Sequence, residues 1–257
     1  DHDTISGWDE AKVFATNHGI RFVPGVELTC DVELPWDEKI LSESGRDRSP
    51  TSWHLLAYFP YHPNPEGLQL FKEWLDPLQN DRVPRMLEMI ELVNGFGMNI
   101  EVDDVMNRAQ GSVGRPHLAQ AMVDAGHVSS MNEAFDLWLG DGRPCSVIRP
   151  KPSLAEASRL VHAAGGITSL AHPRYYGVDY ERLVQHLKES KVDAIEAFHR
   201  SHSDEERHSI WQAATKAGLA VTVGSDFHTP KGGHRPGHMP VVESTLPDLI
   251  VSEESDQ

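Results

Sequence analysis

The sequence predicts an α/β fold in which short strands alternate with helices, as in a parallel barrel or a doubly wound sheet. Short apolar segments rich in β-branched residues recur between segments whose apolar residues have helical spacing. Three of the helical segments begin with the capping pattern Ser-x-x-Glu, at Ser130, Ser153 and Ser203, and end at glycine. No repeat other than this alternation is present, which favours α/β over all-α and all-β classes.

In the first 65 residues we expect a helix at 8–18 and a strand at 22–28. An irregular segment at 31–52 and a second strand at 53–59 follow. The irregular segment is rich in charged residues, Ser and Pro and has no period, so it is interpreted as a loop or mobile excursion. Glu27 lies in the first strand and His54 near the start of the second.

Residues 66–150 are expected to form a small helical insertion, because helical spacing here replaces the alternation. The spacing runs through residues 68–96, with a break near Pro77 or Pro84. Two further helices are expected at residues 114–126 and 130–140. The chain is therefore divided into 1–65, the first part of the main domain; 66–150, the insertion; and 151–257, the second part.

The alternation returns after residue 150. Strands are expected at residues 167–171, 192–198 and 219–223, and helices at 153–166, 180–190 and 203–218. His172 directly follows the first of these strands, and Asp226-x-His228 follows the last. In a parallel α/β fold the carboxyl ends of the strands converge, so we expect these side chains to meet.

Composition limits the possible partners. The net charge of −16 argues against a generic binder of duplex nucleic acid or of membrane surfaces. It does not exclude an anionic substrate, because divalent cations can reverse the local sign. No apolar segment reaches the roughly 18 residues of a membrane span. With only two cysteines, a reducing cytoplasm is the expected compartment.

Carboxylate and imidazole groups recur at the predicted strand ends. They are His2, Glu27, His172, Asp226 and His228, joined by His54 if that strand boundary shifts by a few residues. This mixture suits two or three Mn, Fe, Zn or Mg ions, and such clusters serve enzymes that hydrolyse esters, amides or phosphates. Each residue alone could be an ordinary hydrogen-bonding or ion-pairing group, but their joint position at separate strand ends argues for a metal site.

Five ordered motifs resemble those of the PHP (polymerase and histidinol phosphatase) family of metal-dependent phosphoesterases. They are Asp1-His2-Asp3-Thr4, Pro24-Gly25-Val26-Glu27, His54-Leu-Leu-Ala-Tyr58, Ala171-His172-Pro173 and Gly224-Ser-Asp-Phe-His228. Finer motifs are similar to the branch that hydrolyses nucleoside 3′,5′-bisphosphates and short oligonucleotides. These are Gly114-Arg115-Pro116-His117, Ser201-His202-Ser203 and the Gly-rich tail after His228.

The resemblance implies a distorted barrel of about seven βα units with three metal ions over the carboxyl ends of the strands. Glu27 would bridge two ions. Asp226 would hold the first ion with it, His54 and His172 would complete another, and His2 and His228 would share the third. The family begins with a strand ending in His-x-His followed by an Asp. Because these opening elements are missing here, we expect a longer natural chain that supplies three more ligands.

Three further residues are candidates for holding the substrate. Arg115, at the start of a helix, and Arg143, in a loop, could bind a phosphate, and His202 could donate to it or protonate the leaving oxygen. The alternative for each arginine is an ordinary solvated surface charge, and the alternative for His202 is a hydrogen bond at the start of a helix. His199, His234 and His238 are interpreted mostly as loop residues.

The function expected is hydrolysis of phosphate monoesters of nucleotides, either nucleoside 3′,5′-bisphosphates or the 5′ ends of short oligonucleotides, through attack by metal-generated hydroxide. The alternatives are a histidinol-phosphate-type phosphatase, using the same metals, and a non-catalytic metal-binding PHP module. A generic amidohydrolase is disfavoured because no lysine suited to carbamylation ends a predicted strand.

Overall fold

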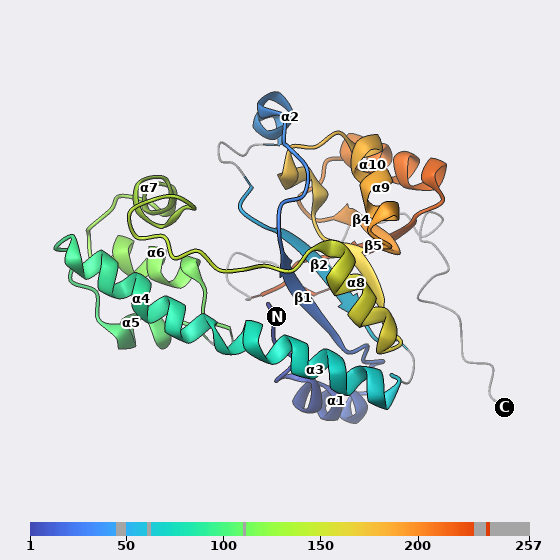
Figure 1. Ribbon diagram of the computed structural model, residues 1–257, viewed down its shortest axis with the longest axis horizontal. Coiled ribbons are helices and arrows are strands. Elements are labelled where there is room, and N and C mark those ends of the chain that lie inside the picture. Colours follow the sequence, from blue (N-terminus) through green and yellow to red (C-terminus); the bar gives the residue numbers. More distant parts are fainter. Residues whose placement is uncertain (45–49, 61–62, 110–111, 229–234, 237–257) are drawn as a thin grey trace. The chain divides into compact units, whose positions relative to one another are not determined.

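The computed structural model describes residues 1–44, 50–60, 63–109, 112–228 and 235–236 (Figure 1). The chain divides into two compact units. The helical unit comprises Asp1–Thr4 and Lys72–Lys151, and the sheet unit comprises Ile5–Phe71 and Pro152–Gln257. Each unit is described by itself below.

The sheet unit contains the α/β alternation. Its strands are β1 (Gly25–Cys30), β2 (Trp53–Tyr58), β3 (Ile167–Leu170), β4 (Ala194–His199) and β5 (Ala220–Gly224). Its helices are α1 (Trp8–Asn17), α2 (Glu38–Glu43), α8 (Leu154–Ala163), the 3-10 helix η2 (Pro173–Tyr176), α9 (Tyr180–Glu189) and α10 (Asp204–Ala217). The α/β class is therefore confirmed.

The strands form one sheet in the order β1-β2-β3-β4-β5 within the described residues, and it is mixed rather than parallel. β2 pairs antiparallel with both β1 and β3, whereas β3, β4 and β5 are parallel. The expectation of an all-parallel sheet is wrong for β2. Since β2 runs against its neighbours, its start lies at the edge where the other strands end.

The two faces of β2 differ in burial. Trp53, Leu55 and Ala57 are fully buried, whereas the alternate residues are partly exposed. This alternation is typical of a strand with one face in the core. α8 packs against β1, β2 and β3, and α10 packs against β4, β5 and α9. His54 lies on the less buried face.

Two elements of the sheet unit were not expected from the sequence. The irregular segment at 31–52 contains α2, which is only 6 residues long and too short to show a helical period. Asp37 caps it by accepting hydrogen bonds from the backbone N–H groups of Lys39 and Ile40. η2, directly after His172, was also not expected. Residues 45–49 of the irregular segment lie outside the described part.

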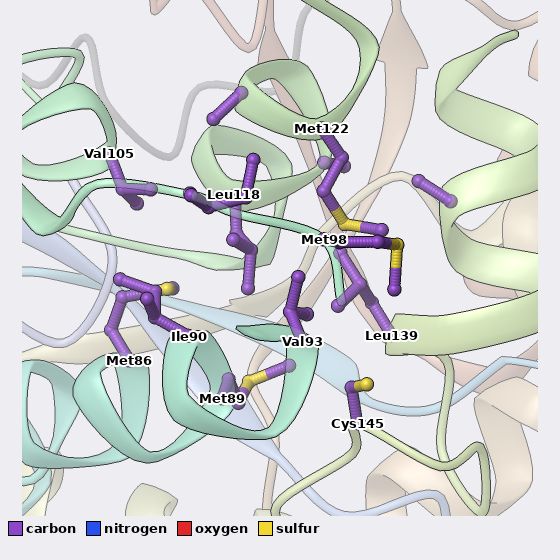
Figure 2. Packing of buried hydrophobic residues seen from close by; sticks show 14 of the residues in the cluster. Met86, Met89, Ile90, Val93, Met98, Val105, Leu118, Met122, Leu139 and Cys145 are labelled. Atoms are coloured by element: carbon purple, nitrogen blue, oxygen red, sulfur yellow. The ribbon is translucent and has the colours of Figure 1, made fainter. Parts of the chain in front are cut away.

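The helical unit has its own apolar core (Figure 2). Its helices are α4 (Arg82–Gly95), α5 (Val102–Met106), α6 (Arg115–Asp124), α7 (Met131–Ala134) and the π-helix η1 (Phe135–Leu139). The unit boundary falls inside α3 (Pro65–Asn80). Methionine and aliphatic side chains of α4 and α6 interdigitate in the core, among them Met86, Ile90 and Met122.

The break expected near Pro77 or Pro84 falls between them, at Asp81. Pro77 lies inside α3 and Pro84 in the first turn of α4, where a missing N–H costs nothing. α5, of 5 residues, was not expected, and the helix expected at 130–140 is α-helical only to Ala134.

None of the helices in the described part of the chain is both long enough and apolar enough to cross a bilayer. The barrel closure and the domain limits inferred from the sequence stay predictions.

Candidate metal centre

Glu27 and His54 are placed beside each other by the pairing of β1 with β2. His54 lies opposite Thr29, two residues along β1 from Glu27, so both side chains project from the same face. The Oε1 atom of Glu27 is 2.7 Å from Nδ1 of His54. Both side chains are largely buried, which strengthens their interaction.

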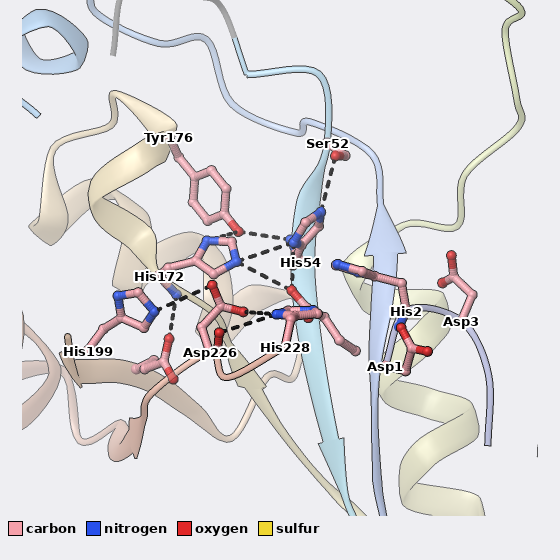
Figure 3. A network of polar contacts seen from close by, with 12 residues as sticks. Asp1, His2, Asp3, Ser52, His54, His172, Tyr176, His199, Asp226 and His228 are labelled. Carbon is pink, nitrogen blue, oxygen red and sulfur yellow. Dashed lines mark hydrogen bonds and ion pairs between the residues drawn. The ribbon is translucent and has the colours of Figure 1, made fainter. Parts of the chain in front are cut away.

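His172 completes a three-residue cluster (Figure 3). It follows β3, whose end lies beside the start of β2 because these strands are antiparallel. Its Nε2 atom is 3.2 Å from Nδ1 of His54 and 3.4 Å from Oε1 of Glu27. One ligand atom from each residue lies within 4.8 Å of the other two. We call these residues the Glu27–His54–His172 cluster.

The imidazoles of the cluster are held by neighbouring polar groups. The hydroxyl of Tyr176, in η2, accepts a hydrogen bond from the backbone N–H of His54 at 2.9 Å and lies 3.4 Å from Nδ1 of His172. The Oγ atom of Ser52 is 3.4 Å from Nε2 of His54. Such outer contacts fix the orientation of metal-binding histidines.

Asp226 and His228 pair with each other just beyond β5. Nδ1 of His228 is 3.1 Å from Oδ1 of Asp226. This hydrogen bond raises the pKa of His228, and the charge of Glu27 acts in the same direction. Burial alone would raise the pKa of Asp226, but its hydrogen bond with His228 and its positive neighbours lower it. A cation bound by both side chains would displace their shared proton.

The donor set fits a divalent metal ion. The cluster brings together a carboxylate oxygen and two imidazole nitrogens. A further carboxylate and imidazole, those of Asp226 and His228, lie within the electrostatic influence of Glu27. Mixed oxygen and nitrogen ligands suit Mn, Fe, Zn and Mg better than they suit soft metals. These residues could therefore hold divalent ions, and the number and identity of the ions stay predictions.

Two buried residues of β4 belong to the same region but were not identified from the sequence. Glu196 is 3% exposed, and burial together with the charges of Glu27 and Asp226 raises its pKa to about 8. His199 is the last residue of β4 and 1% exposed, so its assignment to a loop is wrong. A fully buried strand has no polar alternation that would have marked either residue.

The ring of His199 faces Asp226. Its Nδ1 atom accepts a hydrogen bond from the backbone N–H of Ser201 at 3.2 Å, so the neutral ring has its proton on Nε2. Nε2 lies 3.9 Å from Oδ2 of Asp226, which also contacts Arg200 at 3.4 Å. Burial, followed by the charge of His172, lowers the pKa of His199 to about 4.

His202 lies in the turn between β4 and α10 and is buried. Its Nδ1–H donates to the backbone oxygen of Ala197 at 2.9 Å, and its Nε2 has no hydrogen-bond partner among the residues that the structure describes. Burial lowers its pKa to about 3, so the ring is neutral near pH 7. His202 as a proton donor to the leaving group stays a prediction.

The other candidates lie in the helical unit. His2 is half-buried, and its backbone N–H donates to Oδ1 of Asp1 at 2.8 Å. Arg115 is the first residue of α6, and its Nη1 atom contacts Oδ1 of Asp141 at 2.5 Å and the oxygen of Leu139 at 3.3 Å.

Arg143 is exposed. The relation of these candidates to the cluster stays a prediction. His234, His238 and the Gly-rich tail lie outside the described residues.

Arg85 is a further cation of the helical unit, and no sequence pattern marks it as a candidate. It lies in α4, and its Nε–H donates to the backbone oxygen of Val147 at 2.8 Å. Burial, then the charges of Arg115 and Arg149, lower its pKa to about 10. Helical spacing could not reveal that Arg85 and Arg115 interact, because they belong to different helices.

No model of a known protein family matches the chain. Individual proteins of known name do match the chain. A 3′,5′-nucleoside bisphosphate phosphatase of Chromobacterium violaceum is 30% identical over 244 residues, covering 93% of this chain and 79% of the relative. The 5′-3′ exoribonuclease Rnm of Salmonella typhimurium is 32% identical over 239 residues, covering 90% and 74%. A 5′-3′ exoribonuclease of Haemophilus influenzae is 29% identical over 251 residues, covering 96% and 84%.

Two solved structures share the fold. An amidohydrolase of Chromobacterium violaceum with bound sulfate matches with a TM-score of 0.74 and 28% identity, covering 96% of this chain and 80% of that one. A protein of Bifidobacterium adolescentis described as a metal-dependent phosphoesterase matches with a TM-score of 0.71 and 28% identity, covering 98% and 86%. The chain therefore belongs to the PHP family of metal-dependent phosphoesterases and is a hydrolase.

Proposed function

We propose that this protein hydrolyses phosphate monoesters of nucleotides, namely nucleoside 3′,5′-bisphosphates or the 5′ ends of short oligonucleotides, with two or three divalent ions. The observation that supports this most directly is the Glu27–His54–His172 cluster, in a chain whose relatives are named as nucleotide phosphatase and exoribonuclease. The distorted barrel stays part of the proposal, supported by the likeness to the two solved structures. A cytoplasmic location is likewise proposed.

The residues of the sheet unit would bind the metal ions. Glu27, His54 and His172 would hold one ion, and Asp226 with His228 would take part in holding others. Bound divalent ions supply an activated water and positive charge against the phosphate. Nε2 of His199 lies 3.9 Å from Oδ2 of Asp226, which is too far for a hydrogen bond, so His199 would form part of the buried wall beside this carboxylate.

The helical unit would contribute cations for a second phosphate or a nucleotide backbone. Arg115 and Lys151 both approach Asp141, at 2.5 Å and 3.8 Å, and Arg85 lies within electrostatic reach of Arg115. These cations gather near Asp141 in a chain whose net charge is −16. Guanidinium groups suit phosphate because they can bind it bidentately.

A phosphate-release assay tests the proposal. The full chain, supplied with Mn²⁺, is offered nucleoside 3′,5′-bisphosphates, 5′-mononucleotides, histidinol phosphate and a short 5′-phosphorylated RNA. We expect the bisphosphates or the RNA to give the highest kcat/KM. Preference for histidinol phosphate would favour the alternative phosphatase, and binding of Mn²⁺ without turnover of any substrate would favour the non-catalytic module.

Replacing Arg115 by Ala is expected to raise KM by about 10- to 100-fold, the range for losing a charged hydrogen bond. Metal content should stay at the wild-type level, because Arg115 is not among the proposed ligands. Steady-state kinetics and metal analysis on the same preparation check both. Arg159→Ala, which removes an exposed arginine of α8, is the control. Unchanged kinetics in Arg115→Ala would remove this residue from the substrate site.

A further inference from the structure

We propose that Glu196 is a positioning residue: its carboxylate holds the backbone of His172 so that the imidazole faces Glu27 and His54. The proposal rests on the metal-binding role given to the cluster in the proposed function. It concerns a residue that contacts the backbone of a proposed ligand and acts through it.

The first support is a hydrogen bond at the end of β3. The N–H of Ala171 donates across to the backbone oxygen of His54 at 2.9 Å, continuing the pairing with β2. The N–H of the next residue, His172, donates to Oε2 of Glu196 at 2.8 Å. A side-chain carboxylate therefore takes the place of a backbone acceptor where the β3–β4 pairing ends.

The second support is the backbone conformation of His172. Its φ is 29° and its ψ is 57°, a region that residues with a Cβ atom rarely adopt. Such a conformation persists only where the surroundings determine it, and it is concentrated at functional sites. A hydrogen-bond acceptor held on the N–H of the same residue is a direct way to stabilise it.

The third support is the space made for the carboxylate. Glu196 is 3% exposed, and a Cβ atom at Gly224, on the neighbouring strand β5, would overlap its Oε1 atom. The pairing of β4 with β5 also has an irregularity between Glu196 and Phe198. Bulges of this kind redirect side chains near active sites. Gly224 thus leaves room for Glu196, two residues before the proposed ligand Asp226.

Metal affinity tests the proposal without relying on turnover. Mn²⁺ dissociation constants are measured on the full chain by competition with a chelator, for the wild type, Glu196→Ala and Glu196→Gln. We expect Glu196→Ala to weaken one Mn²⁺ site by about 10- to 100-fold, the range for removing an outer-sphere partner. Glu196→Gln keeps an oxygen that can accept a hydrogen bond from the N–H of His172, so its Mn²⁺ affinity should fall by less than roughly tenfold.

Two glycine variants test the packing. Gly224→Ala should push the carboxylate from its place and weaken the same Mn²⁺ site, whereas Gly7→Ala should not, because a Cβ atom there meets nothing within 4 Å. Glu205→Ala, the loss of an exposed carboxylate in α10, controls for net charge. Melting in EDTA identifies any variant that has failed to fold, and Glu196→Gln then provides the comparison with the wild type.

The outcomes separate this proposal from the proposed function. A wild-type chain that binds no Mn²⁺ contradicts the proposed function. Wild-type binding that Glu196→Ala leaves unchanged overturns the positioning role. If folded Glu196→Gln loses as much affinity as Glu196→Ala, the charge matters rather than the hydrogen bond, which also overturns it. Retained affinity in Glu196→Gln together with loss in Glu196→Ala and Gly224→Ala supports it.

Discussion

Replacing Glu27 by Gln is expected to remove bound metal and to lower kcat/KM by about 1,000-fold or more. The substitution keeps the shape of the side chain but removes the charge that lies 2.7 Å from His54 and 3.4 Å from His172. The two imidazoles of His54 and His172 would then be what remains of the cluster. Because a catalytic ion contributes several kcal/mol, and each 1.36 kcal/mol is a factor of ten, a loss of this size follows.

Metal analysis and kinetics on the same preparation check the result. Glu10→Gln changes an exposed carboxylate of α1 and should leave both unchanged. The folded state of Glu27→Gln is verified by melting in EDTA, where the wild type also lacks metal. If Glu27→Gln keeps wild-type metal content and rate, Glu27 does not bridge metal ions.

The position of His54 shows how far strand patterns can predict a site. The segment 53–59 was recognised as a strand beginning near His54, and the structure has β2 at Trp53–Tyr58. In a parallel sheet, His54 joins the other strand ends only if this boundary shifts by a few residues. The boundary is correct, and the direction of β2 is what differs. The alternation of apolar and polar residues is the same whichever way a strand runs, so it could not predict that β2 is antiparallel to its neighbours.

Glu196 and His199 show where the sequence is least informative. Predicted site residues such as Glu27 and His172 were found by their position at strand ends and by their family motifs. β4 is buried along its whole length, and its polar residues lie within an otherwise apolar strand. Their importance follows from contacts with residues distant in the chain, His172 and Asp226, and only the tertiary structure supplies these.

Asp3 has a structural role that the sequence did not predict, because the motif Asp1-His2-Asp3-Thr4 pointed to His2 as a candidate ligand. Its side chain is fully buried, and Oδ2 contacts Nη2 of Arg82 and, at 3.5 Å, Nη1 of Arg149. Both arginines belong to the helical unit, as does the segment Asp1–Thr4. The charge of Asp3 thus fastens the segment that contains His2 to this unit. It also opposes the lowering of the Arg149 pKa, which is caused chiefly by burial.

We therefore expect Asp3→Asn to lower the free energy of unfolding by about 3 kcal/mol, toward the low end of the range for breaking a buried ion pair. The low end applies because Arg149 keeps a contact with Asp81 at 3.3 Å. Asn is the suitable replacement, since the φ of Asp3 is 51° and Asn tolerates that region. For a chain of this size the melting temperature should fall by about 6–12 °C.

Chemical and thermal unfolding of the full chain measure this, with Asp76→Asn, at an exposed position of α3, as the control. Asp3→Asn within about 0.5 kcal/mol of the wild type would place Asp3 among ordinary surface substitutions and contradict the assigned role. A double variant separates the ion pair from other effects. Arg149→Met combined with Asp3→Asn should destabilise the protein less than the sum of the two single changes, because in the Arg149→Met background Asp3→Asn leaves one arginine, Arg82, without its carboxylate instead of two.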